Sequence, residues 1–121
     1  MKQKLKVAKA DMKENELILR IEDGSVLNLN AMGQILADSD NLSFVYIADH
    51  NDEYIYISLP YSVWSELKRA YDHKLPVYVA DAKGERLALE GFHEELGDLI
   101  ENIRGNSNYG EEMVSKVESI F

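Results

Sequence analysis

The side chains best suited to chemistry lie in and just after a predicted helix over residues 92–104. His93 and Arg104 fall on one flank of that helix, because each residue advances an α-helix by about 100°. Histidine side chains exchange protons near neutral pH and arginine binds anions bidentately, so this flank suits a small anionic ligand. Further polar contacts are predicted from the corner that follows and from an upstream acidic segment; these residues are Asn106, Asn108, Tyr109, Asp38 and Asp40.

The same side chains also have a purely structural interpretation, which the pattern favours. His93 would pack at the margin of the core, and Gly97 would admit a neighbouring helix. Arg104 would pair with Glu101, three residues back on the same helix. The run 105–110 would be a corner between two helices, because Gly and Asn tolerate left-handed backbone angles.

Recognisable catalytic and cofactor motifs are absent. The sequence contains no glycine-rich nucleotide loop, no H-E-x-x-H zinc motif and no G-x-S-x-G elbow. It has no cysteine, which excludes disulfides, zinc–thiolate sites and thiol nucleophiles. Asp38 begins a segment that resembles a calcium loop, but the sixth position is Ser43, where an EF-hand requires glycine. We therefore expect no metal and no cofactor, and the balance favours a protein that is not an enzyme.

Charge and hydropathy narrow the range of partners. The net charge is −9, whereas a nucleic-acid surface needs Lys and Arg to replace counterions, so nucleic acid and anionic membranes are not expected partners. No apolar run approaches the roughly 18 residues that span a bilayer. The basic start is not followed by the apolar stretch of about 7–15 residues that a secretory signal needs. We expect a cytoplasmic protein.

Local patterns place these residues on an α+β fold. Alternating apolar residues predict strands over 4–7, 16–22, 42–48, 53–59, 77–80 and 86–89. Apolar residues at helical spacing predict helices over 29–38, 63–71, 92–104 and 113–121. Strands come first and in pairs, and helices collect toward the C-terminus. We therefore predict one domain over residues 1–121, a mainly antiparallel sheet with three to four helices packed on one face.

Tyr54 and Tyr56 indicate a second kind of candidate surface. They share one face of the predicted strand 53–59, whose other face carries Ile55 and Ile57. Either helices cover both faces, or the tyrosines contact a partner, since tyrosine is favoured at protein interfaces. We predict a small acidic protein that binds a protein partner, as a monomer or small homo-oligomer. The alternative is a protein or enzyme that binds a small anionic ligand beside His93.

Three segments together resemble a known family. They are Gly33–Asn41, Phe92–Leu96 and Asn102–Gly110. Their order and spacing are similar to those of uncharacterised protein family number 0738 of low-GC Gram-positive bacteria, and the resemblance covers nearly the whole chain. It implies a bacterial cytoplasmic protein and carries no activity, substrate or site.

Overall fold

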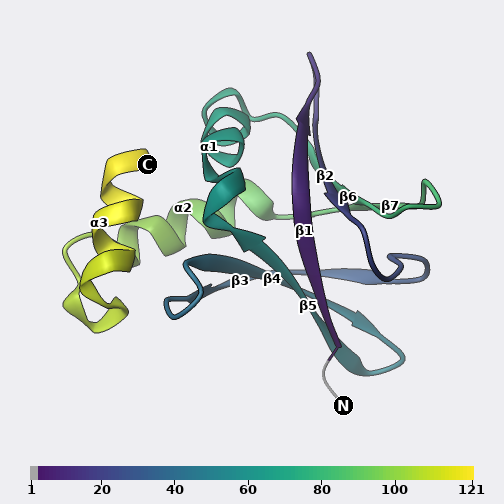
Figure 1. Ribbon diagram of the computed structural model, residues 1–121, viewed down its shortest axis with the longest axis horizontal. Coiled ribbons are helices and arrows are strands. Elements are labelled where there is room, and N and C mark those ends of the chain that lie inside the picture. The colour runs from purple at the N-terminus through teal and green to yellow at the C-terminus, as the bar shows by residue number, and fades with distance from the viewer. Residues whose placement is uncertain (1–2) are drawn as a thin grey trace.

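The computed structural model describes residues 3–121, which form a curved sheet and three helices (Figure 1). The strands are β1 Gln3–Met12, β2 Leu17–Ile21, β3 Asn30–Asp38, β4 Ser43–His50, β5 Glu53–Pro60, β6 Val77–Ala80 and β7 Arg86–Ala88. The helices are α1 Trp64–His73, α2 Phe92–Ile103 and α3 Glu111–Ile120, with 3₁₀ turns η1 Tyr61–Val63 and η2 Ser107–Tyr109. Across residues 3–121, every helix is too short or too polar to span a lipid bilayer.

The strands form one mixed sheet in the order β3-β4-β5-β1-β2-β6-β7, curved into a half-barrel. The pairs β3–β4, β4–β5, β1–β2 and β6–β7 are antiparallel, whereas β1–β5 and β2–β6 are parallel. The predicted mainly antiparallel sheet with three to four helices is therefore wrong. The sequence predicted the strands on either side of the β4–β5 and β6–β7 turns, but it missed β3 and did not show that β1 lies between β5 and β2. That placement makes two of the pairings parallel.

Strand β1 changes partners along its length. Its first part, Gln3–Lys6, pairs with β5, and its second part, Val7–Met12, pairs with β2. The register with β2 shifts between Val7 and Lys9, which marks a bulge where the partners change. Bulges bend a strand and increase its twist. β1 therefore joins a part built on β3, β4 and β5 to a part built on β2, β6 and β7.

The predicted helix over 29–38 is wrong, because this segment is strand β3. Residues 34–38 pair with Ile47–Ser43 of β4, and Asp38–Asn41 leads into the turn between the two strands. Gly33 has φ +66°, which no helix accommodates. The apolar residues that suggested a helix are split between two faces: Ile35 is buried, whereas Met32 and Leu36 are exposed. Pairing with β4 outweighed the local spacing.

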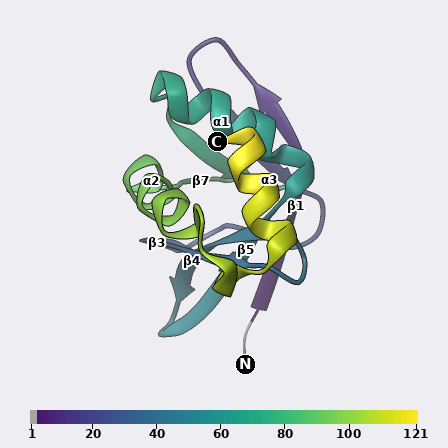
Figure 2. The same cartoon turned by 90° about the vertical axis from the view of Figure 1, so that its left-hand side faces the viewer.

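The predicted helical stripes on the other helices are confirmed. Leu96, Ile100 and Val117 are buried, and together with α1 they cover the inner side of the sheet. Figure 2 shows the three helices in front of the strands. Trp64 stacks on Phe44 of β4, with 4.3 Å between ring centroids and 8° between ring planes. Because the helices fill the inner face of the sheet, its outer face is the one available for contacts with other molecules.

Tyr46 fastens the two ends of the half-barrel together. Its buried hydroxyl donates to the Glu90 carbonyl at 2.6 Å and accepts from the Gly33 N–H at 3.1 Å. Burial raises the pKa of Tyr46, so this hydroxyl keeps its proton for donation. Gly91 lies beside Gly33, since a Cβ on Gly91 would be in van der Waals contact with the Cα of Gly33, at 3.6 Å. The bulge of β3 and the start of α2 are thus held against each other.

Asp81 fastens two loops in a similar way. It is 5% exposed, and its Oδ1 accepts from the N–H groups of Lys83 (2.9 Å) and Glu85 (3.0 Å). Its Oδ2 accepts from the Val26 N–H (3.1 Å) and the Ser25 hydroxyl (3.2 Å). Burial alone raises the pKa of Asp81, but the four hydrogen bonds outweigh burial and hold that pKa below its usual value. The carboxylate ties the β2–β3 loop to the β6–β7 turn.

Candidate functional site

His93 lies in the first turn of α2 and is held by the connection between α1 and β6. Its Nε2 lies 2.6 Å from the Leu75 carbonyl oxygen, and a carbonyl only accepts, so Nε2 carries the proton. Its Nδ1 is buried and has no partner within the described residues. A hollow of about 540 Å³ adjoins the ring and is lined by Tyr71, Asp72, Lys74, His93 and Glu94. Two carboxylates against one lysine do not favour an anionic ligand in this hollow.

Gly97 does not provide an open notch for a ligand. A Cβ at this position would lie 2.8 Å from the hydroxyl oxygen of Tyr71, which comes from α1. The Tyr71 and His93 rings are tilted at 58° with centroids 6.0 Å apart. The structural interpretation of Gly97 is therefore confirmed: the missing side chain lets a neighbouring helix approach.

Arg104 lies at the other end of α2 from His93. The two residues are separated by about 16 Å along the helix axis, from a rise of about 1.5 Å per residue. Arg104 forms an ion pair with Glu101 at 3.1 Å, as its structural interpretation predicted, and its Nη2 donates to the Phe121 carbonyl at 2.6 Å. One small ligand cannot contact both the histidine and the arginine.

The corner after α2 is filled by its own hydrogen bonds. The Asn106 side chain accepts from the Asn108 N–H at 3.1 Å and donates to the Asn102 carbonyl at 3.2 Å. The Gly105 N–H donates to Glu118 of α3 at 2.9 Å. Tyr109 is half-buried and packs against the core. These contacts stabilise the connection between α2 and α3. Ser107 and Asn108 are exposed, and Gly105 and Ser107 border a hollow of about 800 Å³ together with residues of α3.

Asp38 and Asp40 lie in the hairpin between β3 and β4. Asp38 accepts hydrogen bonds from the N–H and the side-chain amide of Asn41, at 3.4 and 2.9 Å, and Asp40 is exposed. Across residues 3–121, no cluster of three His, Asp or Glu side chains is arranged to hold a metal ion. Asp38 lines a hollow of about 280 Å³ that does not include His93, Arg104 or the corner after α2. The fold thus distributes the predicted ligand contacts over three separate places.

The predicted tyrosine surface lies on the outer side of the sheet. Tyr54 and Tyr56 alternate with the buried Ile55 and Ile57, and Tyr54 is 56% exposed. Cross-strand register adds neighbours from three other strands in two rows, Gln34–Ile47–Tyr56–Lys4 and Leu36–Val45–Ser58–Lys6. We call the surface formed by Leu36, Val45, Ile47, Tyr54, Tyr56, Lys4 and Lys6 the outer patch.

The outer patch combines apolar and basic side chains. Leu36 is 45% exposed, whereas Ile47 is only 4% exposed, although it faces away from the core cluster. A shallow hollow on the patch is lined by Lys4, Leu36, Ala37, Asp38, Val45 and Tyr56. This arrangement resembles the centre of a protein interface, where apolar and aromatic side chains are ringed by polar ones.

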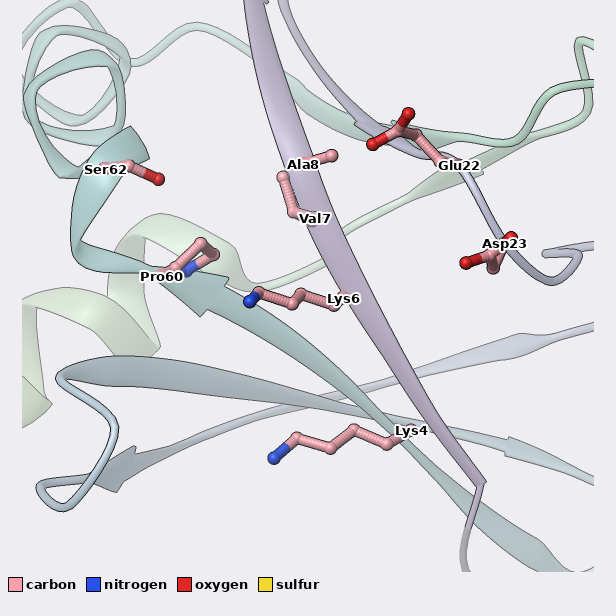
Figure 3. Close-up of a pocket in the computed structure, with 8 residues that line it drawn as sticks. All are labelled: Lys4, Lys6, Val7, Ala8, Glu22, Asp23, Pro60 and Ser62. Atoms are coloured by element: carbon pink, nitrogen blue, oxygen red, sulfur yellow. The ribbon is translucent and has the colours of Figure 1, made fainter.

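A second hollow, of about 510 Å³, adjoins the patch where β1 leaves β5. It is lined by Lys4, Lys6, Val7, Ala8, Glu22, Asp23, Pro60 and Ser62. Figure 3 shows Lys4 and Lys6 extending from β1 in the same direction, toward β5, while Glu22 and Asp23 lie on the opposite side of β1. Lys4 therefore borders both hollows, whereas Lys6 borders only the second.

Sequence reasoning found the tyrosines of the outer patch and missed its other members. Leu36 falls in the segment predicted as a helix, and Lys4 and Lys6 fall in a predicted strand to which no partner surface was assigned. A signal for β3 was present: Asp38–Asn41 lies between two apolar runs, as a hairpin loop does. No local signal showed that β1 lies beside β5.

Comparison with known proteins shows to which family the chain is similar. The model of a family of unknown function, UPF0738, matches residues 5–121. A UPF0738 protein of Bacillus licheniformis is 40% identical over 121 residues, covering 100% of this chain and 99% of the relative. UPF0738 proteins of Bacillus cereus and Bacillus thuringiensis are each 39% identical over 123 residues, with the same coverage. No solved structure matches the chain. The chain belongs to the UPF0738 family.

Proposed function

We propose that this protein acts by binding another protein through its outer patch, in the cytoplasm, and that it is not an enzyme. The observation that carries the proposal is the exposure of Leu36 and Tyr54, on a face that the three helices leave uncovered. Contiguous apolar surface on a small protein is costly to leave in water, and it is typical of interaction sites. Tyrosine at such a site contributes a large contact area at a small entropic cost.

The hydrogen bonds made by the polar residues of the predicted ligand site also favour protein binding over ligand binding. His93, Arg104 and Asn106 each bond to a backbone carbonyl, and Asp38 bonds to its own turn. Side chains used in this way position the elements of the fold, whereas a ligand site needs several polar groups that converge on one cavity. The outer patch instead presents large exposed apolar and aromatic side chains, Leu36 and Tyr54.

The test is site-specific photo-crosslinking in Bacillus cells. A photoreactive phenylalanine analogue replaces Tyr54 in one variant and the exposed Glu112 of α3 in a control variant. We expect a discrete crosslinked protein from position 54 that position 112 does not give. Fractionation of the same cells tests the cytoplasmic location.

The captured protein is then purified and its affinity for the chain is measured. Leu36→Asp places a charge at an exposed apolar position of the patch, and we expect the dissociation constant to rise about tenfold or more. The matched control is Leu27→Asp, which changes another exposed leucine outside the patch and should leave the affinity unchanged. Absence of a position-specific crosslink, or equal effects of the two substitutions, would contradict the proposal.

A further inference from the structure

We infer that the segment bound on the outer patch is an amphipathic α-helix with acidic side chains along one flank. This inference rests on the proposed function and names the kind of partner that the patch fits. It follows from the backbone of the sheet, from the spacing of the two lysines and from the distribution of charge.

The backbone of the sheet excludes strand addition at the patch. Strands β4, β5 and the first part of β1 lie inside the sheet or are paired along β5, so their hydrogen-bonding groups are directed at neighbouring strands. An extended peptide gains affinity by pairing with a free sheet edge, and the strand of the patch that lies at an edge of the sheet, β3, has α2 packed against it. A helix satisfies its own backbone and offers an apolar stripe, and helices are the elements that cover sheet faces in layered domains.

The spacing of the basic groups fits the flank of a helix that runs along β1. Lys4 and Lys6 are two residues apart on one strand, about 6.6 Å at a rise of about 3.3 Å per residue. Carboxylates four residues apart on a helix are separated by about 6 Å along its axis. In Figure 3 both lysines extend toward β5, which is the side where Tyr56 lies. A helix lying over β5 would meet the lysines with one flank and the apolar side chains with its stripe.

The charge distribution selects an acidic flank. The chain carries a net charge of −9, yet the charged groups on the β1 side of the patch, beside Tyr56 and Ser58, are Lys4 and Lys6. Asp38, the last residue of β3, and Asp49, which pairs with Tyr54 near the end of β4, lie on the other side of the patch. Each is hydrogen-bonded to an asparagine, Asn41 and Asn30 respectively. The remaining acidic surface repels an acidic partner, so electrostatics guide such a helix toward the two lysines.

Three synthetic peptides test the inference, with fluorescence anisotropy and the full chain. The first is a helix of about 20 residues with a leucine stripe and glutamates at i and i+4 on one flank. The second has the same sequence with two central prolines, which break the helix. The third has lysine in place of each glutamate. We expect the first peptide to bind and the other two to bind at least about tenfold more weakly.

Variants of the chain locate the contact. Lys4→Gln with Lys6→Gln should weaken binding of the acidic helix about tenfold or more and reduce its salt dependence. The matched control is Lys13→Gln with Lys83→Gln, which removes the same charge at exposed positions away from the patch. Equal effects of the two double variants would overturn the assignment of the flank.

The outcomes separate this inference from the proposed function. Equal binding of the proline-containing peptide, or no binding of the acidic helix, overturns the helical partner, while a position-specific crosslink at residue 54 leaves protein binding intact. Equal binding of the lysine-containing peptide overturns the acidic flank. Loss of both the peptide signal and the crosslink overturns both proposals.

Discussion

Replacing Asp81 by asparagine should destabilise the protein more than any other single exchange of an acid for its amide. Asparagine retains one acceptor oxygen, which can serve Lys83 and Glu85 as Oδ1 does now. Its NH₂ group would then face the N–H of Val26, which donates to Oδ2 in the native chain. Two donors would meet in a site that is 5% exposed.

The size of the effect follows from the groups involved. A buried N–H left without an acceptor costs about 1–3 kcal/mol, and the bonds that remain lose the strength that the charge supplied. The Ser25 hydroxyl can rotate to accept, which spares part of the cost. We expect a loss of about 2–3 kcal/mol in the free energy of unfolding, a large share of the 5–15 kcal/mol typical of a domain.

Urea unfolding followed by the fluorescence of Trp64 measures the loss. This tryptophan is fully buried and stacked on Phe44, so its emission should change when the core opens. With a typical slope of 1–3 kcal/mol/M, the midpoint should fall by roughly 1–2 M without a change in slope. Asp98→Asn, at an exposed position of α2, is the control and should change stability by less than about 0.5 kcal/mol.

The pH dependence of the same difference tests the reasoning more severely. The folded-state pKa of Asp81 is lowered from the ordinary value of 3.8, so its contribution is present above pH 3.8 and is lost as the pH falls through the folded-state pKa. The difference in the free energy of unfolding between the native chain and the Asp81→Asn variant should therefore be constant near neutral pH and should shrink below about pH 4. A gap under 0.5 kcal/mol at pH 7, or one that does not narrow in acid, would refute the account.

Two further substitutions probe the fold around the candidate sites. Tyr46→Phe removes the hydroxyl between Gly33 and Glu90 and should cost about 1–3 kcal/mol in urea unfolding, whereas Tyr54→Phe on the outer patch should cost less than about 0.5 kcal/mol. Gly97→Ala should lower the melting temperature, because overpacking against the Tyr71 hydroxyl costs about 1–3 kcal/mol and helix propensity returns at most about 1. Adding Tyr71→Phe should restore most of that loss, and a double variant no more stable than Gly97→Ala would contradict the predicted clash.

The elements that sequence predicted well are those with one strong local period. Strands β4 and β5 combine aromatic and β-branched residues, and α2 has a single apolar stripe that is buried as predicted. The segment 29–38 was misassigned because both periods fit its apolar residues, and only pairing with β4 decided between them. The parallel pairs could not be predicted for a related reason. Gln3 pairs with Ile55, which is distant in the sequence, and no local pattern encodes that contact.

How well each candidate site could be predicted also depends on whether its contacts are local in the sequence. The structural interpretation of His93, Gly97 and Arg104 could be stated in advance, because it depends on helical geometry and on contacts within one or two turns. The outer patch could only be half predicted. Tyr54 and Tyr56 share a strand and hence a face, but Lys4 joins them through a pairing that only the assembled sheet reveals.

The position of β1 between two partners also sets the order in which a nascent chain can be completed. As the chain leaves the ribosome, β1 and β2 can form a hairpin early, since a short loop connects them. The other edge of β1 stays unpaired until the chain has been synthesised as far as Ser58 of β5. The free edge of β2 stays unpaired until Ala80 of β6 has been added. Partly folded intermediates therefore expose unpaired strand edges. Lysines on such an edge discourage pairing with other chains. Lys4 and Lys6 therefore protect the growing polypeptide from aggregation before they are in place to meet any partner.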